Sequence, residues 1–289
     1  MELRAYQNTL SKAPKTAIIS GEDRARREFL EEITLMNSWF TVETLDAQTF
    51  DISEYSHWEE THCYLLCGSK KAALIDTGLG VCNIKSVVKR LTTLPIIVFT
   101  SHVHWDYIGS HWLFDCIAVH EAEKDWISGD FPLTLQEVKK QLAKTPCNFP
   151  GGFNINAYRI FQGKPQILLH DGDSFDLGER KLQVIHTPGH SPGHCCFYEP
   201  ERKFIYCGDL IDTGCLDAFY PSTNPRLFHR SVKRLMTLDI DRVLPGHHDL
   251  RIPVSLIGEI EADFSQLERR RQLKQGNGLF DFGKIQIHI

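Results

Sequence analysis

The sequence has no apolar run of about 18 residues or more, the length that a transmembrane helix needs. Its first six residues (MELRAY) lack the apolar core of a secretory signal peptide. The nine cysteines are scattered and form no CxxC pair, a pattern typical of reduced thiols rather than a disulfide framework. We therefore expect a cytoplasmic protein that does not associate with a membrane.

The sequence also lacks an excess of basic residues. Lysine and arginine number 32 against 37 acidic residues, so the formal net charge is −5. Proteins that bind nucleic acid usually carry a basic patch or stripe, and we therefore predict no nucleic-acid partner. The 289 residues allow one large domain or two small ones with a sizeable core. The oligomeric state stays open, a homodimer included.

Short apolar or alternating segments separated by polar turns predict a succession of strands from Trp39 onward. The predicted strands cover residues 39–45, 49–53, 63–66, 72–76, 94–99, 117–120, 166–169, 181–186, 195–198, 204–207, 242–244 and 284–289. Apolar residues at helical spacing predict helices over residues 84–91, 225–238 and 255–274. Strands and helices together predict an α/β architecture.

Two stretches differ from this pattern. Residues 1–35 include a heavily charged segment, and Met36 stands directly before the first strand-like run. We interpret residues 1–35 as a peripheral N-terminal extension and Met36 as a candidate start. Residues from about 121 to 165 favour helices and a loop with exposed aromatic residues. We interpret them as a helical insertion that covers the site within a domain of residues 36–289, because specificity often resides in loops on a rigid scaffold.

Histidine and aspartate residues occur in four loops that directly follow apolar strands. The loops contain His102, His104 and Asp106, then His190 in a Thr-Pro-Gly-His segment, then Asp209 after a glycine, and then His247 in a Pro-Gly-His segment. Alternate residues of an extended segment point the same way, so His102 and His104 can bind one cation together. Strand ends on one edge of a sheet can converge, and imidazole and carboxylate groups bind zinc or iron. The pattern predicts a metal site.

The order of these motifs resembles the metallo-β-lactamase superfamily, and in particular its intracellular metallo-hydrolases. The matching residues span about 39–250 and are Asp76-Thr77-Gly78, His102-x-His104-x-Asp106, His190, Asp209 and His247. The resemblance implies an α/β (α+β) fold, an αββα sandwich. In this fold two mixed β-sheets pack together, helices flank them, and the metal site lies at one sheet edge.

The resemblance also implies a ligand set and a reaction. His102, His104 and His190 would bind a first metal ion, Asp106 and His247 a second, and Asp209 would bridge the two. The implied cofactor is Zn²⁺, one or two ions per chain, with iron as an alternative. Such a metal lowers the pKa of water from about 15.7 toward about 7. Metal-bound hydroxide would then attack an electrophilic carbonyl or phosphorus, with Asp106 orienting the nucleophile.

Tyr107 departs from the family pattern, in which a histidine at this position binds the second metal ion. A phenol with a pKa of about 10 is a much poorer zinc ligand than imidazole at neutral pH. Three outcomes stay open: a weakened two-metal site, a one-metal site, or ligation by Tyr107 as a phenolate. His111 is a weaker candidate replacement, because it lies a helical turn away.

Aromatic residues predict an apolar pocket for an acyl or aryl group. Residues 213–221 directly follow Asp209 and include Phe219 and Tyr220. The loop of residues 121–165 adds others: Phe149, Phe153 and Tyr158. We therefore predict hydrolysis of a small-molecule ester, thioester or lactone. Tyr107 and Tyr220 are candidate catalytic groups that could donate a hydrogen bond to an oxyanion.

Two other functions fit the same residues. A mononuclear iron dioxygenase of the persulfide dioxygenase type would use His102, His190 and Asp209, and would not need a histidine at position 107. A binding protein whose catalytic site decayed at Tyr107 is the other alternative. Metal analysis separates the three, because two zinc ions favour the hydrolase, one iron with oxygen uptake favours the dioxygenase, and no metal favours decay.

The remaining polar residues near these motifs have simpler explanations. Asp76 is expected to brace the metal-binding loops through hydrogen bonds. His186 and His194 flank His190, and ordinary polar roles are favoured for both. His57 and His62 are candidates for the border of the cavity.

Overall fold

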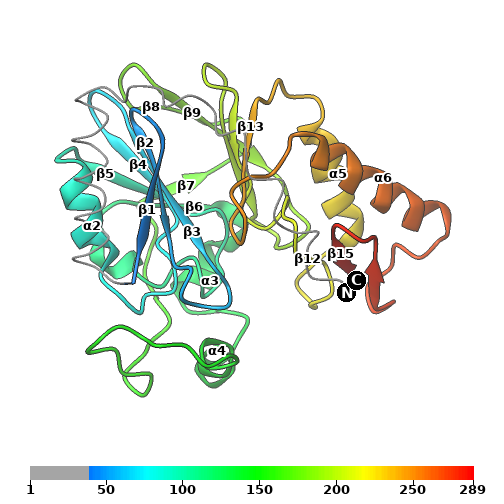
Figure 1. Ribbon diagram of the computed structural model, residues 1–289, viewed down its shortest axis with the longest axis horizontal. Helices are drawn as coiled ribbons and strands as arrows, with labels where there is room; N and C mark the ends of the chain where they lie inside the picture. Colours follow the sequence, from blue (N-terminus) through cyan, green and yellow to red (C-terminus); the bar gives the residue numbers. More distant parts are fainter. Residues whose placement is uncertain (1–38) are drawn as a thin grey trace, which may run out of the picture.

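The computed structural model describes residues 39–289, so the predictions for residues 1–35 and Met36 lie outside the described residues. The described residues form two large sheets and one small sheet. Figure 1 shows helix α2 outside the sheet that contains β1–β7, and helices α5 and α6 on the opposite side of the molecule, beyond β13. No helix among residues 39–289 is both long and apolar enough to cross a membrane.

The first large sheet contains seven strands that follow chain order. They are β1 (Thr41–Asp46), β2 (Thr49–Ser53), β3 (His62–Cys67), β4 (Ala72–Ile75), β5 (Ile96–Phe99), β6 (Ile117–His120) and β7 (Ile167–Leu169). Strands β1 to β4 pair antiparallel, and β4 to β7 pair parallel. A parallel connection needs a crossover, and helix α2 (Ile84–Leu91) provides it between β4 and β5.

The second large sheet has the strand order β13-β11-β10-β9-β8. Its strands are β8 (Ser174–Asp176), β9 (Lys181–His186), β10 (Cys195–Glu199), β11 (Phe204–Tyr206) and β13 (Arg242–Leu244). Only β11 and β13 pair parallel in this sheet, and helix α5 (Pro225–Leu235) lies between them in the chain. The small sheet joins β12 (Cys215–Asp217), β15 (Gln286–His288) and β14 (Leu279–Asp281).

Three clusters of buried apolar residues correspond to the three interfaces of a four-layer sandwich. One contains residues of both large sheets, such as Phe99 of β5 and Phe197 of β10, whose rings meet at 5.6 Å. Another joins the first sheet to α2, and the third joins the second sheet to α5 and α6 (Ser255–Arg269). Burying apolar area in this way is the main favourable term in folding. The predicted αββα sandwich with two mixed sheets is confirmed.

Residues 121–165 connect β6 to β7 and form helical turns and loops. They contain the 3-10 turn η2 (Glu121–Glu123), α3 (Lys124–Ser128) and α4 (Leu135–Leu142). Thr134 and Glu137 form a capping box that begins α4, as its sequence favours. Figure 1 shows α4 projecting from the edge of the first sheet.

Three strands were absent from the sequence-based predictions: β8, β12 and β14. Each has only three residues and carries no long apolar run. Their existence depends on pairing partners elsewhere in the chain, such as Gln286–His288 for β12. The predicted helices at 225–238 and 255–274 begin where expected but end earlier, at Leu235 and Arg269.

Candidate metal centre

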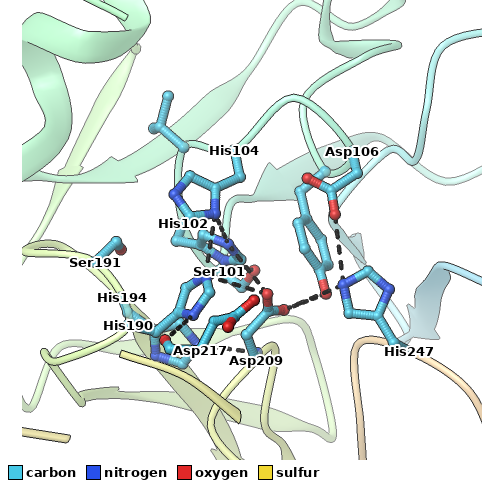
Figure 2. A network of polar contacts seen from close by, with 12 residues as sticks. Ser101, His102, His104, Asp106, His190, Ser191, His194, Asp209, Asp217 and His247 are labelled. Carbon is cyan, nitrogen blue, oxygen red and sulfur yellow. Dashed lines mark hydrogen bonds and ion pairs between the residues drawn. The ribbon is translucent and has the colours of Figure 1, made fainter. Parts of the chain in front are cut away.

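The four predicted metal-binding loops come together at the carboxyl ends of their strands. They follow β5, β9, β11 and β13, which belong to both large sheets. Figure 2 shows Asp209 between two groups of side chains, with the three histidines of one group on one side and Asp106 and His247 on the other. The sandwich therefore places six predicted metal ligands at one edge.

The first group contains three imidazoles and one carboxylate. His104 Nδ1 lies 2.9 Å from His102 Nε2 and 3.0 Å from His190 Nε2. Asp209 Oδ2 lies 3.2 Å from His190 Nε2 and 3.7 Å from His102 Nε2. All four donor atoms lie within 4.8 Å of one another. One cation placed among them could contact all four.

The hydrogen bonds of the outer ring nitrogens show that this group suits a metal ion. His190 Nδ1 contacts the carbonyl oxygen of Asp217 at 3.0 Å. A carbonyl only accepts hydrogen bonds, so Nδ1 carries a proton, and Nε2 is the ring nitrogen directed toward Asp209 Oδ2. Metal-binding histidines commonly donate their other N–H in this way.

Burial adjusts the charges of these side chains. It lowers the pKa of His104 to about 3 and the pKa of His102 well below its usual value. Both rings are therefore neutral at neutral pH and keep lone pairs for a metal. Burial opposes ionisation of Asp209, but nearby positive charge, that of His190 first, holds its pKa well below its usual value. The group therefore combines the neutral imidazoles of His102 and His104 with an ionised carboxylate.

A second group lies beside the first and contains Glu59, Asp106 and His247. His247 Nε2 is 3.4 Å from Asp106 Oδ2 and 3.6 Å from Asp209 Oδ1, so Asp209 reaches both groups. His247 Nδ1 contacts the carbonyl oxygen of Glu59 at 2.7 Å, which again directs Nε2 toward the carboxylates. Burial, followed by the charge of Asp106, raises the pKa of Glu59 to about 8.

Glu59 was missed by the sequence analysis. It belongs to the loop between β2 and β3, far along the chain from the predicted ligands and outside every recognised motif. Its only signal was proximity in sequence to His57, which had been expected at the border of the cavity.

Tyr107 is fully buried, and its hydroxyl donates a hydrogen bond to Asp209 Oδ1. Burial, and then the charge of Asp209, raises the pKa of Tyr107 well above 10. The hydroxyl therefore serves as a donor to Asp209, and ligation by Tyr107 as a phenolate stays a prediction. A side chain at Gly246 would collide with this hydroxyl, which explains the glycine in the Pro-Gly-His segment.

Glu123, a second residue missed by the sequence analysis, joins two metal-binding loops. Its fully buried carboxylate accepts hydrogen bonds from Val103 N at 2.5 Å, from Gly193 N at 2.8 Å and from the hydroxyl of Ser191. These donors flank the first-group histidines in sequence. Glu123 comes from η2, and no motif in the sequence marked it.

Asp76 and His194 hydrogen-bond the backbone of loops that carry predicted ligands. Asp76 Oδ1 accepts a hydrogen bond from Ser101 N at 2.8 Å, the bracing role expected for it. His194, for which an ordinary polar role was favoured, accepts from the backbone N–H of Asp209 through Nε2 at 3.2 Å. Its Nδ1 lies 2.9 Å from the hydroxyl of Thr187. His194 therefore orients the loop that carries Asp209.

The other histidines considered from the sequence have partners outside the two groups. His111 bonds the hydroxyls of Thr77 and Thr100, at 2.7 and 2.8 Å, so both ring nitrogens are occupied. His62 is 3.0 Å from Asp51, and His186 Nε2 is 3.0 Å from the carbonyl oxygen of Pro192. His57 contacts α4 through the carbonyl oxygen of Leu142 at 3.1 Å.

One aromatic side chain from residues 121–165 lies beside the metal centre. Trp126 of α3, which the sequence analysis did not single out, lies nearly parallel to the His104 ring at 6.4 Å between centroids. Phe149 contacts Phe153 at 4.7 Å and His57 at 6.3 Å. Tyr220 lies outside both donor groups and is 43% exposed. Trp126 therefore places one apolar ring beside the first group, whereas Phe149 and Phe153 pack against the core of the first sheet.

Comparison with known proteins identifies the class. The family model described as the metallo-β-lactamase superfamily matches residues 58–247, well over half of the chain. The chain therefore belongs to the metallo-β-lactamase superfamily and is a hydrolase of that fold. Members of this superfamily generally bind divalent metal ions, in agreement with the His/Asp groups described above.

Two of the similar proteins are named as hydrolases of thioesters. Human acyl-coenzyme A thioesterase MBLAC2 is 30% identical over 229 residues, which cover 72% of this chain and 81% of the relative. Hydroxyacylglutathione hydrolase GloC of Haemophilus influenzae is 28% identical, covering 65% and 85%. Among solved structures, a metallo-β-lactamase from Pontibacter korlensis has a TM-score of 0.57 at 16% identity, covering 78% of this chain and 99% of its own. This last similarity supports the fold alone.

Proposed function

We propose that this protein is a metal-dependent thioesterase that hydrolyses an acyl thioester of a small thiol. The convergence of His102, His104 and His190 on Asp209, with their lone pairs directed inward, carries the metal-dependent part. The names of two relatives, an acyl-coenzyme A thioesterase and a hydroxyacylglutathione hydrolase, support the thioester. We propose zinc as the metal, because the site offers the imidazole and carboxylate ligands that zinc accepts and hydrolysis needs no redox change.

The chain's own residues have separate tasks in this reaction. When bound, the metal supplies Lewis acidity, which polarises the carbonyl and lowers the pKa of water. The Asp106 carboxylate orients the attacking water and holds its proton. The hydroxyl of Tyr107 donates to Asp209 and fixes the orientation of that carboxylate. Tyr220 is the proposed donor of a hydrogen bond to the oxyanion.

The acidity of the site favours a thioester over an alkyl ester. Hydrolysis forms a carbon–oxygen bond and breaks the bond to the leaving group. Burial raises the pKa of both Tyr107 and Tyr220, so neither phenol is an effective acid for a poor leaving group. A thiol has a pKa of about 8.5 and leaves as thiolate without strong acid assistance. The proton held by Asp106 can reach it afterwards.

The aromatic residues support an acyl group as the recognised part of the substrate. Trp126 lies beside the His104 ring, and Phe149 and Phe153, which contact each other, come from the same segment, residues 121–165. We propose that this segment, as a helical insertion, covers the acyl chain and excludes water from it. An apolar wall with few polar groups is typical of sites that bind such chains.

Release of free thiol from acyl-coenzyme A and from a hydroxyacylglutathione tests the proposal. The purified full chain, loaded with zinc, should release thiol from at least one of them. A matched ester of the same acyl group should react more slowly. Absence of thiol release by fully loaded protein would overturn the proposal. Oxygen consumption by an iron-loaded sample with a persulfide would favour the dioxygenase instead.

A further inference from the structure

The second donor group would be incomplete if it contained only the ligands recognised from sequence. Asp106 and His247 lie on one side of Asp209, and position 107 supplies a phenol that donates to Asp209. We propose that Glu59 is a carboxylate ligand of a second metal ion and replaces the histidine that the family motif has at position 107. This inference rests on the proposed metal dependence but not on the choice of a thioester substrate.

The placement of Glu59 fits this role. One carboxylate oxygen of Glu59, one of Asp106 and one ring nitrogen of His247 lie within 4.8 Å of one another. Asp209 Oδ1 lies 3.6 Å from His247 Nε2 and adds a fourth donor. Three carboxylates and one imidazole form a donor set that a divalent cation such as zinc accepts.

The contacts of Glu59 contrast with those of other inward-facing carboxylates. Glu54 accepts from Trp39 Nε1 at 2.6 Å and from Leu79 N at 2.7 Å. Glu123 accepts three hydrogen bonds. Among residues 39–289, by contrast, no hydrogen bond or close ion pair reaches the carboxylate of Glu59. The oxygens of this half-buried side chain can therefore turn toward a cation placed between Glu59 and Asp106 without breaking a hydrogen bond.

The backbone around Glu59 is held in place, as a ligand requires. Glu59 N donates to His57 Nδ1 at 3.2 Å, and Glu59 O accepts from His247. The indole of Trp58 donates to the carbonyl oxygen of Gln141 in α4 at 3.0 Å. Residues on both sides of Glu59 therefore connect the second metal position to helix α4.

Metal titration of the full chain tests the assignment without any substrate. Chelator-stripped wild-type protein should bind two equivalents of cobalt(II) or zinc. Glu59→Gln, which keeps the size of the side chain, should retain the first equivalent and bind the second at least about tenfold more weakly, the minimum loss typical for disturbing a metal ligand's partner. Glu60→Gln is the matched control, because Glu60 contacts His248 rather than the donor group, and it should bind as wild type.

A second substitution distinguishes a lost ligand from a disturbed fold. Tyr107→His in the Glu59→Gln protein should restore the second equivalent, because it returns the imidazole of the family motif. Circular dichroism and cobalt absorption of the first equivalent confirm that each variant is folded. Equal affinity of wild type and Glu59→Gln for two equivalents would overturn the assignment, and so would a wild-type protein that binds one equivalent at saturation. Failure of thioester hydrolysis with two metals bound would overturn only the proposed substrate.

Discussion

The two halves of the metal centre differ in composition and in how their residues are supported. The first half has three imidazoles on loops that Glu123 and Asp76 tie together. The second half has one imidazole, two carboxylates and a loop that depends on helix α4. No hydrogen bond reaches the carboxylate of Glu59 among residues 39–289, whereas Glu123 accepts three. The first half is therefore held by its own hydrogen bonds, and the second half depends more on a bound cation.

Removing a ligand of the first half should have the largest effect. We predict that His104→Ala abolishes hydrolysis of model thioesters or esters, with a loss of more than about a hundredfold, because even outer partners of metal ligands contribute up to that much. Turnover should be measured at saturating zinc. His170→Ala is the control, since that side chain is exposed and pairs with Glu121. Wild-type turnover by His104→Ala would show that the metal assignment is wrong.

The loop that carries Glu59 begins at Glu54, whose charge should make stability depend on pH. Burial raises the pKa of Glu54 from 4.5 to about 7. A carboxyl with a raised pKa binds more protons in the folded protein than in the unfolded chain. Its contribution to the free energy of unfolding is therefore full below pH 4.5 and is lost as the pH rises through about 7. The free energy of unfolding should fall by up to about 3 kcal/mol over this range.

Glu54→Gln removes the titrating group and tests this expectation. Denaturant unfolding at pH 5 and pH 8 should show a smaller pH dependence for the variant than for wild type. The variant should also be less stable at pH 5, because its amide cannot accept from both Trp39 and Leu79. Parallel pH profiles for the two proteins would contradict the role given to Glu54.

Glu123→Gln should weaken the first half through its loops. The amide can accept from one side only, and its NH₂ group would then face a backbone N–H. We expect the free energy of unfolding to fall by about 2 kcal/mol, the cost of leaving a buried donor unpaired. Glu121→Gln in the same turn, where the side chain is exposed, should change stability little. Equal denaturation midpoints for both variants would show that the hydrogen bonds of Glu123 to Val103 and Gly193 do not stabilise the fold.

Tyr107→His should act on the second half and have the smallest effect. An added imidazole should raise the affinity of the second position for metal by about tenfold, the effect of one supporting contact. The occupancy of that position at limiting zinc should rise accordingly. Tyr107→Phe is the control, since it removes the hydroxyl without adding a ligand. Elemental analysis at limiting zinc provides the measurement. Unchanged stoichiometry in Tyr107→His would show that position 107 does not limit the second metal.

The same contrast explains what could be predicted from the sequence. His102, His104, His190, Asp209 and His247 were recognisable because each follows an apolar strand within a short motif. The edge of packed sheets brings such strand ends together. Residues that the sequence marks at strand ends therefore also meet in the folded protein. The sandwich itself was also predictable, because its longer strands carry clear apolar runs.

The rest depends on contacts between distant parts of the chain. Glu59 meets Asp106 only when the β2–β3 loop reaches the end of β5, and Glu123 meets Gly193 across 70 residues. Trp126 of α3 lies beside His104, although the two residues follow different strands, β6 and β5. None of these residues stands in a motif, and the three-residue strands lack a periodic pattern.

We expect metal bound at this centre to drive thioester hydrolysis. The most direct test measures thiol release from acyl-coenzyme A before chelation, after chelation and after zinc is returned, with metal content determined on the same samples. We predict that activity disappears with the metal and returns in proportion to zinc bound per chain. Thiol release that persists at full rate in metal-free protein would contradict this account.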